Sequence, residues 1–499
     1  MRRWWRIKIT MATTIAPVKI EAASTTRKIL LDGNWVESPH TMSILSPWTG
    51  KSVSTVFEAT AEQARAAGEA ARKVAPAMRA LTCDQRSNAL RKIAAQILLR
   101  LEEISEVIRD EVGKPMWLCR LEVQRGARVF QIAAEEALRL PGEIVYPDQE
   151  PQGAGMVGRI QYFPIGPVLG ITPFNFPLNL AAHKIAPAIA AGCPIVIKPP
   201  PQGPGAALIL GEIILQSGLP PAAFQVLPGG LAAGQALCAS DAFSALSFTG
   251  SARAGWSIKK NALPRQKVLL ELGGDAALIV DESADLDAAA KAASVGAYIY
   301  AGQVCISTQR LFVHRAVADQ FERKLAEKIL TEVSVSANPA DEKAFVGPLI
   351  DNSAADRIEK WTASAVSHGA KTLIKGERRG ERLISPWLLE NVPADEPLSC
   401  EEAFGPVAIL KRVENLQEAI ALTNASRYGL QASVFTQSLR NAETAYREID
   451  AGAVLVNIPT AFRIDAALYG GTKDSGFGRE GVKEVVREFS EPKLLVVKP

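Results

Sequence analysis

The stretch GPVLGITPFNFPLNLAAHKIAPAIAAGCPIVIK, residues 166–198, has the pattern of a strand, a helix and a second strand. The apolar runs PVLGIT and PIVIK enclose a segment of helical spacing from Leu178 to Ala191. One more helical segment and four apolar runs alternate after it, at 205–216, 224–227, 245–248, 267–272 and 277–280. Strands that alternate with helices form a parallel sheet, so the pattern predicts a doubly wound α/β layer that binds ligands at the carboxyl ends of its strands.

The sequence on either side of this stretch predicts further units. Residues 59–140 carry apolar side chains at spacings of three and four, which is typical of outer helices. A second alternating block runs from Leu286 to about Asn457, so we expect two α/β domains that face each other across a cleft. The strand-like GRIQYF within 146–163 interrupts the first block, and we expect it to pair with the terminal KLLVVKP as an arm.

Length and charge narrow the class of protein. At 499 residues the chain exceeds the roughly 250 to 300 residues at which a single core stops growing, which favours two or three domains. The 56 basic and 53 acidic residues give a formal charge of +3, so the balance indicates no nucleic-acid or membrane partner and favours a small-molecule ligand. No apolar run reaches the roughly 18 residues of a membrane span, and MRRWWRIKIT lacks the core of a secretory signal. We interpret residues 1–20 as a disordered extension.

The cysteines are scattered, without a CxxC pair or zinc-ligand spacing, at Cys83, Cys119, Cys193, Cys238, Cys305 and Cys400. This spacing predicts neither a disulfide framework nor a metal site. A reducing cytoplasm is therefore the expected location.

The glycine pattern GxGxxG occurs twice, at 153–158 and at 476–481. A dinucleotide-binding loop needs a strand before the first glycine and a helix after the last one. The first motif leads into a strand, and the second follows the polar turn GGTKDS. We therefore interpret both as turns that need positive φ angles.

Three local patterns carry candidate chemistry, each with a plainer structural alternative. SFTGS, 247–251, follows a strand-like run and opens a helix, so its amides either face a phosphate or form an ordinary turn. Glu271 ends the strand of VLLELGG, where we expect a carboxylate that is poised, not buried, or one that is merely solvated. Cys305 in GQVC is either a nucleophile or an inert buried thiol, and His183 is interpreted as a packed core residue.

A series of motifs along most of the chain resembles the aldehyde dehydrogenase superfamily, in the family's order: EVGKP (111–115), TPFNFP (172–177), VIKP (196–199), FTGS (248–251), LELGG (270–274), GQVC (302–305), EEAFGP (401–406) and YGGTKDSGFGRE (469–480). The resemblance implies an α/β fold in three parts. These are a Rossmann-like parallel-sheet cofactor domain (21–142 and 165–273), a catalytic domain (274–480) and a small β oligomerisation arm (143–164 and 481–499). It also implies a homodimer or homotetramer, since an unpaired strand edge is otherwise a liability.

The resemblance also implies a reaction. Cys305 would attack the aldehyde, and Asn175 with the Cys305 amide would hold the oxyanion. Hydride would pass to NAD or NADP, and Glu271 would activate the water that hydrolyses the thioester. The implied cofactor contacts are Thr172, Phe174, Lys198, Pro201, Gly250, Ser251, Glu402 and Phe404.

Two departures from common patterns of the family, at Pro201 and Val304, bear on cofactor and substrate, together with two matched arginines. Pro201 stands where many NAD-specific members have a ribose-binding Glu, which predicts use of NADP or of both cofactors. Arg125 and Arg463 match two of the arginines with which the branch resembling non-phosphorylating glyceraldehyde-3-phosphate dehydrogenase binds anionic substrates, whereas Val304 replaces a third. With Phe176 as a further substrate contact, we expect a small hydroxy- or acid-substituted aldehyde, such as lactaldehyde or a semialdehyde.

Two alternatives stay open. A CoA-acylating semialdehyde dehydrogenase would pass the acyl group to a thiol, but such members generally lack the glutamate that Glu271 matches. A non-enzymatic relative could retain the fold alone, although packing does not require all of the matched polar side chains at once.

Overall fold

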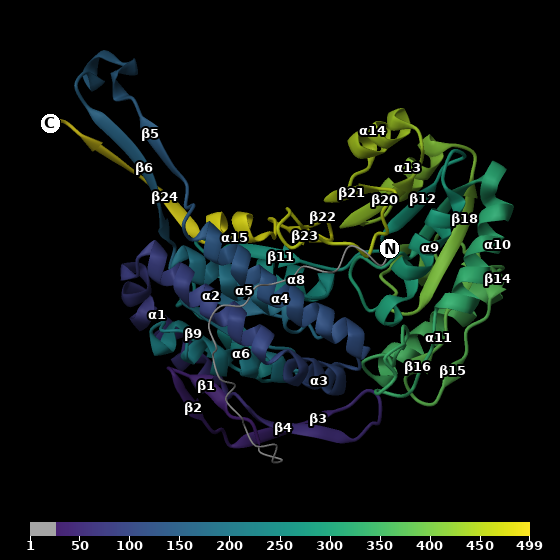
Figure 1. Cartoon of the computed structure of the whole chain (residues 1–499), viewed down its shortest axis with the longest axis horizontal. Helices are drawn as coiled ribbons and strands as arrows, with labels where there is room; N and C mark the ends of the chain where they lie inside the picture. Colours follow the sequence, from purple (N-terminus) through teal and green to yellow (C-terminus); the bar gives the residue numbers. More distant parts are fainter. Residues whose placement is uncertain (1–25) are drawn as a thin grey trace.

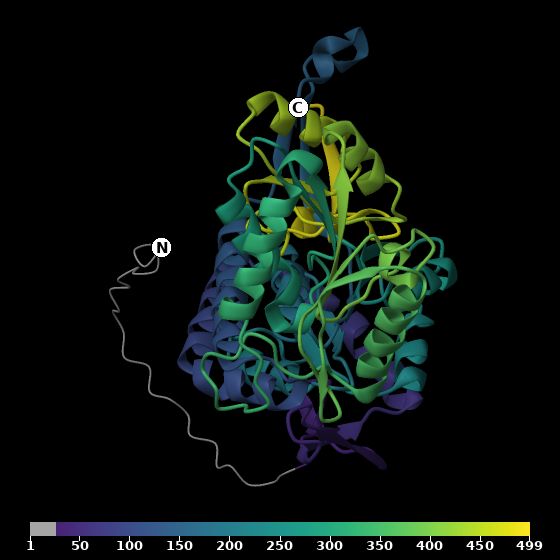
Figure 2. The ribbon, with the colours of Figure 1, turned by 90° about the vertical axis from the view of Figure 1, so that its right-hand side faces the viewer.

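The computed structural model describes residues 26–499, so the interpretation of residues 1–20 lies outside the described part. The chain forms two large α/β blocks and a thin three-stranded arm that projects beyond both (Figures 1 and 2). Within 26–499, no helix is both long and apolar enough to cross a bilayer.

The first block contains an eight-stranded sheet in the order β2-β1-β9-β8-β7-β10-β11-β23. Its strands are β1 (Ile29–Leu31), β2 (Asn34–Val36), β7 (Val168–Ile171), β8 (Ile195–Lys198), β9 (Phe224–Val226), β10 (Ala245–Thr249), β11 (Lys267–Glu271) and β23 (Gly476–Phe477). The five strands from β9 to β11 are parallel, and β7, the first of them in the chain, lies in the middle. The predicted doubly wound layer is confirmed, with its point of reversal between β7 and β10.

Helices cover this sheet, and the expected helical region is confirmed. They are α1 (Ala61–Ala80), α2 (Cys83–Leu99), α3 (Leu101–Val112), α4 (Met116–Glu136), α5 (Asn179–Ala191), α6 (Gly205–Leu215), α7 (Leu231–Cys238) and α8 (Ala252–Asn261). Thr60 and Thr82 start α1 and α2 with capping boxes, in which the threonine and a glutamine three residues later satisfy each other's backbone N–H groups. Every residue of α5 is buried, because helices and sheet enclose it on all sides.

The second block contains a seven-stranded sheet in the order β14-β17-β18-β13-β12-β20-β21, parallel except at β14. Its strands are β12 (Ala277–Val280), β13 (Arg310–His314), β14 (Lys371–Ile374), β17 (Trp387–Glu390), β18 (Val407–Val413), β20 (Gln431–Phe435) and β21 (Ala453–Val456). The helices are α9 (Leu286–Tyr298), α10 (Arg315–Glu332), α11 (Asn352–Ser367), α12 (Pro397–Cys400), α13 (Leu416–Asn424) and α14 (Leu439–Glu448). The apolar run 277–280, grouped with the first strands in the sequence, thus belongs to this sheet.

The arm is a sheet of β5 (Gly142–Val145), β6 (Val157–Pro164) and β24 (Ser490–Val497). β24 runs antiparallel to β6 from Ser490 opposite Pro164 to Val497 opposite Val157, so the expected pairing is confirmed. The rest of the C-terminal segment lies elsewhere: β23 pairs with β11, and α15 (Val482–Glu488) packs into the core of the first block.

The two GxGxxG motifs differ in how many of their glycines have positive φ angles. The first precedes β6, as expected, but only Gly155 there has a positive φ, of 77°. In the second motif Gly478 and Gly481 have φ angles of 82° and 132°. Gly476 lies in the antiparallel strand β23, so neither motif forms the strand-to-helix loop of a dinucleotide fold.

Candidate active site

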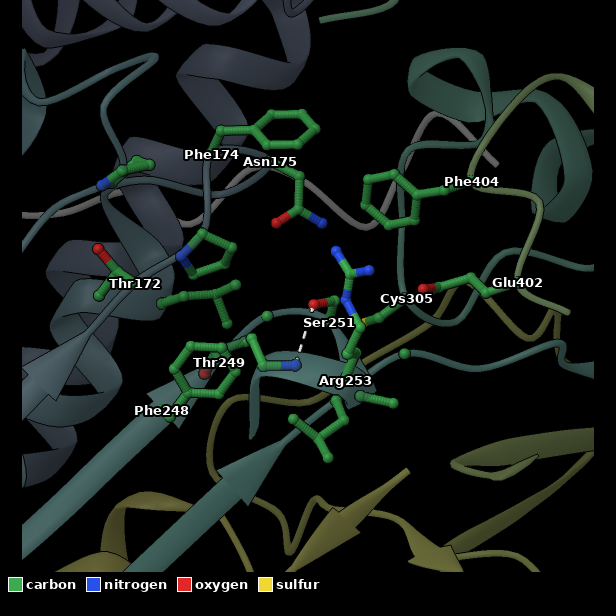
Figure 3. A pocket seen from close by; sticks show the side chains of 18 of the residues that line it. Thr172, Phe174, Asn175, Phe248, Thr249, Ser251, Arg253, Cys305, Glu402 and Phe404 are labelled. Atoms are coloured by element: carbon green, nitrogen blue, oxygen red, sulfur yellow. Dashed lines mark hydrogen bonds between the residues drawn. The ribbon is translucent and has the colours of Figure 1, made fainter. Parts of the chain in front are cut away.

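A cavity of about 1300 Å³ lies between the carboxyl ends of the first sheet and loops of the second block (Figure 3). The sequence-predicted site residues that line it are Thr172, Phe174, Asn175, Lys198, Pro201, Gly250, Ser251, Cys305, Glu402 and Phe404. Lys198 is the last residue of β8, and Thr172 follows β7 directly. Glu271, Arg125, Arg463 and Phe176 are not among the lining residues.

The loop that carries Asn175 is held from both sides. The buried Glu122 carboxylate of α4 accepts hydrogen bonds from the amides of Leu178 and Asn179, at 2.9 and 3.1 Å. The side-chain amide of Asn175 donates to the carbonyl of Gln303 at 3.0 Å. This contact ties the first block to the residue two before Cys305, so the two groups expected to act on one carbonyl are positioned together.

An unusual backbone presents Cys305. Tyr300, Ala301 and Gly302 have φ angles of 53°, 54° and 69°, a left-handed run that needs strong support from its surroundings. The Tyr300 hydroxyl donates to the carbonyl of Val112 at 2.7 Å, and a Cβ on Gly302 would collide with the Gly405 carbonyl. The chain therefore kinks after α9 and turns the Cys305 thiol towards the cavity.

The Cys305 thiol is partly buried in an apolar cluster with Leu118, Val304 and Tyr469. Burial raises its pKa to about 11, and the Tyr469 hydroxyl, 3.1 Å from the sulfur, opposes that rise. Within 26–499, the backbone amide of Cys305 donates to no protein acceptor. The thiol borders an open cavity, which distinguishes it from the inert thiols Cys119 and Cys193 in the core.

Glu271 ends β11, as expected, but the expectation of an unburied carboxylate was wrong. The residue is 5% exposed because the segment 469–480 folds over it, with the backbone of Gly470 next to Oε1. Burial, reinforced by the nearby Glu480 carboxylate, raises the pKa of Glu271 to about 8, while Arg463 and Lys184 oppose the rise. Oε2 of Glu271 has no hydrogen-bond partner among the described residues.

A buried charged cluster lies behind the cavity. Lys184 Nζ lies 3.6 Å from Glu480, and Arg463 donates to Glu480 at 2.8 Å. Nε2 of His183 lies 3.0 Å from Asp465 and 3.2 Å from Arg463. His183 is fully buried, so its interpretation as a core residue is confirmed, although it is a polar member of this cluster.

Arg125 and Arg463 occupy different environments. Arg125 lies on the face of α4 that also carries Leu121 and Trp117, one and two turns earlier, and these two pack into the cluster around Cys305. Its side chain is 25% exposed and pairs with Asp465. The side chain of Arg463 is only 7% exposed and lies over the Tyr469 ring, 3.9 Å from its centroid.

Phe176 belongs to the same apolar cluster as Cys305. The Lys114 ammonium lies 3.7 Å from the centroid of its ring, and Lys114 is itself paired with Glu122 in the interior. The ion pair of Lys114 and Glu122 therefore positions the Phe176 ring as well as the loop that carries Asn175.

The other end of the cavity is polar. Burial lowers the pKa of Lys198 to about 8, and its Nζ donates to the Pro199 carbonyl at 3.2 Å. Pro201 is exposed on the turn that follows. Ser251 caps α8, with its hydroxyl accepting from the Ala254 amide at 3.4 Å, and Thr172 Oγ1 is buried without a partner among residues 26–499.

Glu402 and Phe404 close the cavity from the second block. Glu402 accepts a hydrogen bond from the Gly274 amide at 3.2 Å, and burial raises its pKa to about 7. A Cβ on Gly273 would collide with this carboxylate, so a larger residue there would displace the Glu402 side chain. Phe404 packs edge-on against Phe174 across the cavity, with centroids 5.9 Å apart (Figure 3).

Three residues near this site were not singled out in the sequence. Arg253, the second residue of α8, extends into the cavity (Figure 3), and no protein partner pairs with it within the described range. Its position directly after FTGS was the available signal. Arg357 lines the cavity near Glu402, and no local pattern marks it. Tyr469 contacts Cys305, and its place at the start of YGGTKDSGFGRE was the available signal. Across 26–499, no group of three or more His, Cys, Asp or Glu side chains could hold a metal ion.

The chain is similar to known proteins along most of its length. The model of the aldehyde dehydrogenase family matches residues 35–495. A 3-sulfolactaldehyde dehydrogenase of Priestia aryabhattai is 38% identical, over 94% of this chain and 97% of its own. A lactaldehyde dehydrogenase of Methanococcus maripaludis is 36% identical, over 94% and 99%. The crystal structure of an NADP-dependent glyceraldehyde-3-phosphate dehydrogenase from Bacillus halodurans, complexed with NADP, superimposes with a TM-score of 0.91 at 34% identity, covering 95% of this chain and 99% of that one.

Proposed function

The chain belongs to the aldehyde dehydrogenase family, and on that premise we propose that it oxidises a small hydroxy- or acid-substituted aldehyde to the carboxylic acid with NAD or NADP. The observation that carries the proposal is the juxtaposition at the cavity wall of the Cys305 thiol and the Asn175 amide, joined through Gln303. A thiol and a fixed donor so placed can attack a carbonyl and hold its oxygen.

In the first step the Cys305 thiol would give its proton to a water molecule in the cavity, and the sulfur would then bond to the aldehyde carbon. The oxyanion that forms accepts hydrogen bonds from the second N–H of Asn175 and from the Cys305 amide. A bound nicotinamide supplies the acceptor for the hydride. Loss of hydride leaves a thioester on Cys305; water then attacks it, its proton goes to Glu271, and the C–S bond breaks.

Glu271 has to reach that water from outside the cavity wall. Its carboxylate makes no hydrogen bond within the described part of the chain, so a rotation towards the thioester breaks none. Its pKa of about 8 suits a base that gains and releases a proton near neutral pH.

The residues of the polar end fit a dinucleotide. A bound ligand could use two features of this end, the unpaired Thr172 hydroxyl and the first turn of α8. We assign Lys198 to the adenosine-side ribose and Gly250 with Ser251 to the pyrophosphate, where helix amides favour an anion.

Glu402 would bind the nicotinamide ribose, with Phe404 and Phe174 beside that end. Pro201 offers no carboxylate to repel a 2′-phosphate, and the exposed Arg253 adds a positive charge to the cavity wall. Both features favour NADP, which the Bacillus halodurans structure contains.

The substrate end supports a polar aldehyde. The substrates named for the three relatives each carry a hydroxyl beside the aldehyde, and two also carry a sulfonate or a phosphate. We assign Arg125 to the polar substituent and Phe176 to the apolar wall. Arg463 was expected from the resemblance to be a second substrate contact, but it is buried against the Tyr469 ring. It would therefore influence a substrate only indirectly, through Tyr469.

We extend the proposal to domains and assembly. Residues 21–142 and 165–273 would form the cofactor domain, 274–480 the catalytic domain, and 143–164 with 481–499 the arm. Within the last two units, β23 and α15 return to the first block. The apolar side chains exposed on β24 support pairing of arms in a homodimer or homotetramer. All six cysteines are free, and a catalytic thiol must stay reduced, which suits the cytoplasm.

Reduction of NAD and of NADP by the purified protein tests the function, with lactaldehyde, succinic semialdehyde, glyceraldehyde 3-phosphate and a neutral aliphatic aldehyde. Free acid should form, and Cys305→Ala should abolish turnover. Formation of an acyl-CoA in the presence of CoA would instead support an acylating enzyme. Absence of thiol-dependent turnover with every aldehyde would support a non-enzymatic relative.

A further inference from the structure

The Tyr469 side chain occupies a fixed position beside Cys305. Its hydroxyl oxygen lies 3.1 Å from the sulfur, and the residue is buried. Two backbone hydrogen bonds with Glu480, of 2.7 and 2.6 Å, hold the chain on which the ring is carried. This pair fixes the backbone, and the apolar side chains packed around the buried ring restrict its rotation away from the sulfur.

When the Cys305 thiol ionises, the hydrogen bond between Tyr469 and the sulfur can have only one donor. Burial raises the pKa of the Tyr469 hydroxyl well above its usual value, so the hydroxyl retains its proton. The Cys305 sulfur is its only hydrogen-bond partner within residues 26–499. A thiolate can only accept, so the hydroxyl donates to it.

Arg463 strengthens this donor. Its guanidinium lies 3.9 Å from the centroid of the Tyr469 ring, where a cation is attracted by the ring and draws electron density from it. The Glu480 carboxylate accepts a hydrogen bond from Arg463 at 2.8 Å and holds the guanidinium in this position.

We propose that Tyr469 is a catalytic hydrogen-bond donor to Cys305, which stabilises the sulfur as an anion before attack and again when the thioester breaks. In the second event the electron pair of the C–S bond stays on sulfur, and the proton of the attacking water goes to Glu271. Tyr469 keeps its own proton throughout. The proposal rests on the proposed role of Cys305 as the nucleophile.

A purely structural role for Tyr469 would come from its ring. The ring packs with Leu118, Val304, Ile306 and Leu430, and phenylalanine would preserve that packing. The hydroxyl is therefore the part to remove. The charged groups that face the sulfur, Glu402, Glu271 and Arg463, stay in place in such a variant.

The test is the rate at which iodoacetamide alkylates Cys305 in the full-length protein, followed by peptide mass spectrometry at fixed pH values between 7 and 9. Loss of a hydrogen bond to the charged sulfur should raise the pKa of the thiol by about one to two units. The greater nucleophilicity of a more basic thiolate offsets part of this, so Tyr469→Phe should react about 3- to 12-fold more slowly. Tyr446→Phe, at an exposed position of α14, is the matched control and should react like the wild type.

Site-specific incorporation of 3-fluorotyrosine at 469 tests the same contact without removing it. The more acidic phenol is a better donor, so alkylation should become faster than in the wild type. Equal alkylation rates in folded Tyr469→Phe, or slower alkylation with the fluorinated ring, would overturn the proposal. Turnover by Cys305→Ala would refute the proposed function itself and is measured separately from these rates.

Discussion

Arg125 and Asp465, 340 residues apart in the sequence, form an ion pair with two hydrogen bonds of 2.8 and 2.9 Å. The pair lies next to the apolar cluster around Cys305, and His183 contacts the same carboxylate. Burial alone would raise the pKa of Asp465, but hydrogen bonds with His183 and Arg125 hold it far below its usual range, so this carboxylate is ionised at neutral pH. An anionic substrate that binds Arg125 must share it with this carboxylate.

Arg125→Met should weaken binding of anionic aldehydes. Loss of a charged hydrogen-bond donor should raise KM for sulfonate-, carboxylate- or phosphate-bearing aldehydes about 10- to 100-fold and leave KM for a neutral aliphatic aldehyde unchanged. Steady-state kinetics with both kinds of substrate measure the effect. Arg128→Met, three residues later and exposed, serves as control. An equal loss with the neutral aldehyde would show that Arg125 only supports the fold.

Glu271→Gln should stop the hydrolytic step. General-base catalysis typically contributes about 10² to 10⁴ in rate, so kcat should fall by that factor while a burst of one reduced nicotinamide per site persists. Stopped-flow absorbance separates the burst from turnover. Glu282→Gln, exposed in the second block, should behave as the wild type. Loss of the burst together with turnover would place Glu271 before the thioester instead of after it.

The pH dependence of the wild type follows from the same residue. Burial and Glu480 raise the pKa of Glu271 to about 8, and only the deprotonated carboxylate accepts a proton from water. Wherever hydrolysis limits turnover, kcat should therefore rise with pH and level off above about 8. A kcat profile that is level from pH 6 to 9 would contradict this role.

Asn175→Ala should remove one donor to the oxyanion. Such a donor typically contributes about 10² to 10³ in kcat, with little change in KM, because it meets charge only as the charge develops. Kinetics with the preferred aldehyde measure both constants, and thermal unfolding checks that loss of the contact with Gln303 has not loosened the Cys305 turn. A rise in KM alone would indicate that Asn175 only binds the substrate.

Pro201→Glu should shift preference towards NAD. A carboxylate there repels a 2′-phosphate and accepts bonds from ribose hydroxyls, so kcat/KM for NADP should fall about 10- to 100-fold relative to NAD. Activity with NAD is the control for activity with NADP, since both cofactors are measured on the same preparation of each variant. An unchanged ratio would mean that the 2′-phosphate lies elsewhere, with Arg253 as the next residue to test.

The parallel strands could be predicted from the sequence because short apolar runs and crossover helices are local patterns. The strand-end positions of Lys198 and Glu271 came from the same patterns. The burial of Glu271 could not be predicted, since the segment that covers it lies some two hundred residues later in the chain. The partners of Arg125 and Arg463 depend on distant contacts in the same way.

The left-handed turn before Cys305 could not be predicted from the sequence either. Tyr300 and Ala301 have no intrinsic preference for positive φ. Contacts with two distant positions, Val112 and Gly405, impose their conformation. The family resemblance pointed to the nucleophile, but only the tertiary structure shows how it is presented. Tyr469 as its neighbour likewise depends on the folded loop.

Burial keeps the Cys305 thiol protonated at neutral pH, with a pKa of about 11. Peroxides oxidise thiolates far faster than thiols, so the resting nucleophile is a poor target for conversion to sulfenic acid. The environment that slows ionisation thus also protects the sulfur from oxidative damage between turnovers. The enzyme should keep its activity in dilute hydrogen peroxide better than enzymes whose resting cysteine is already ionised.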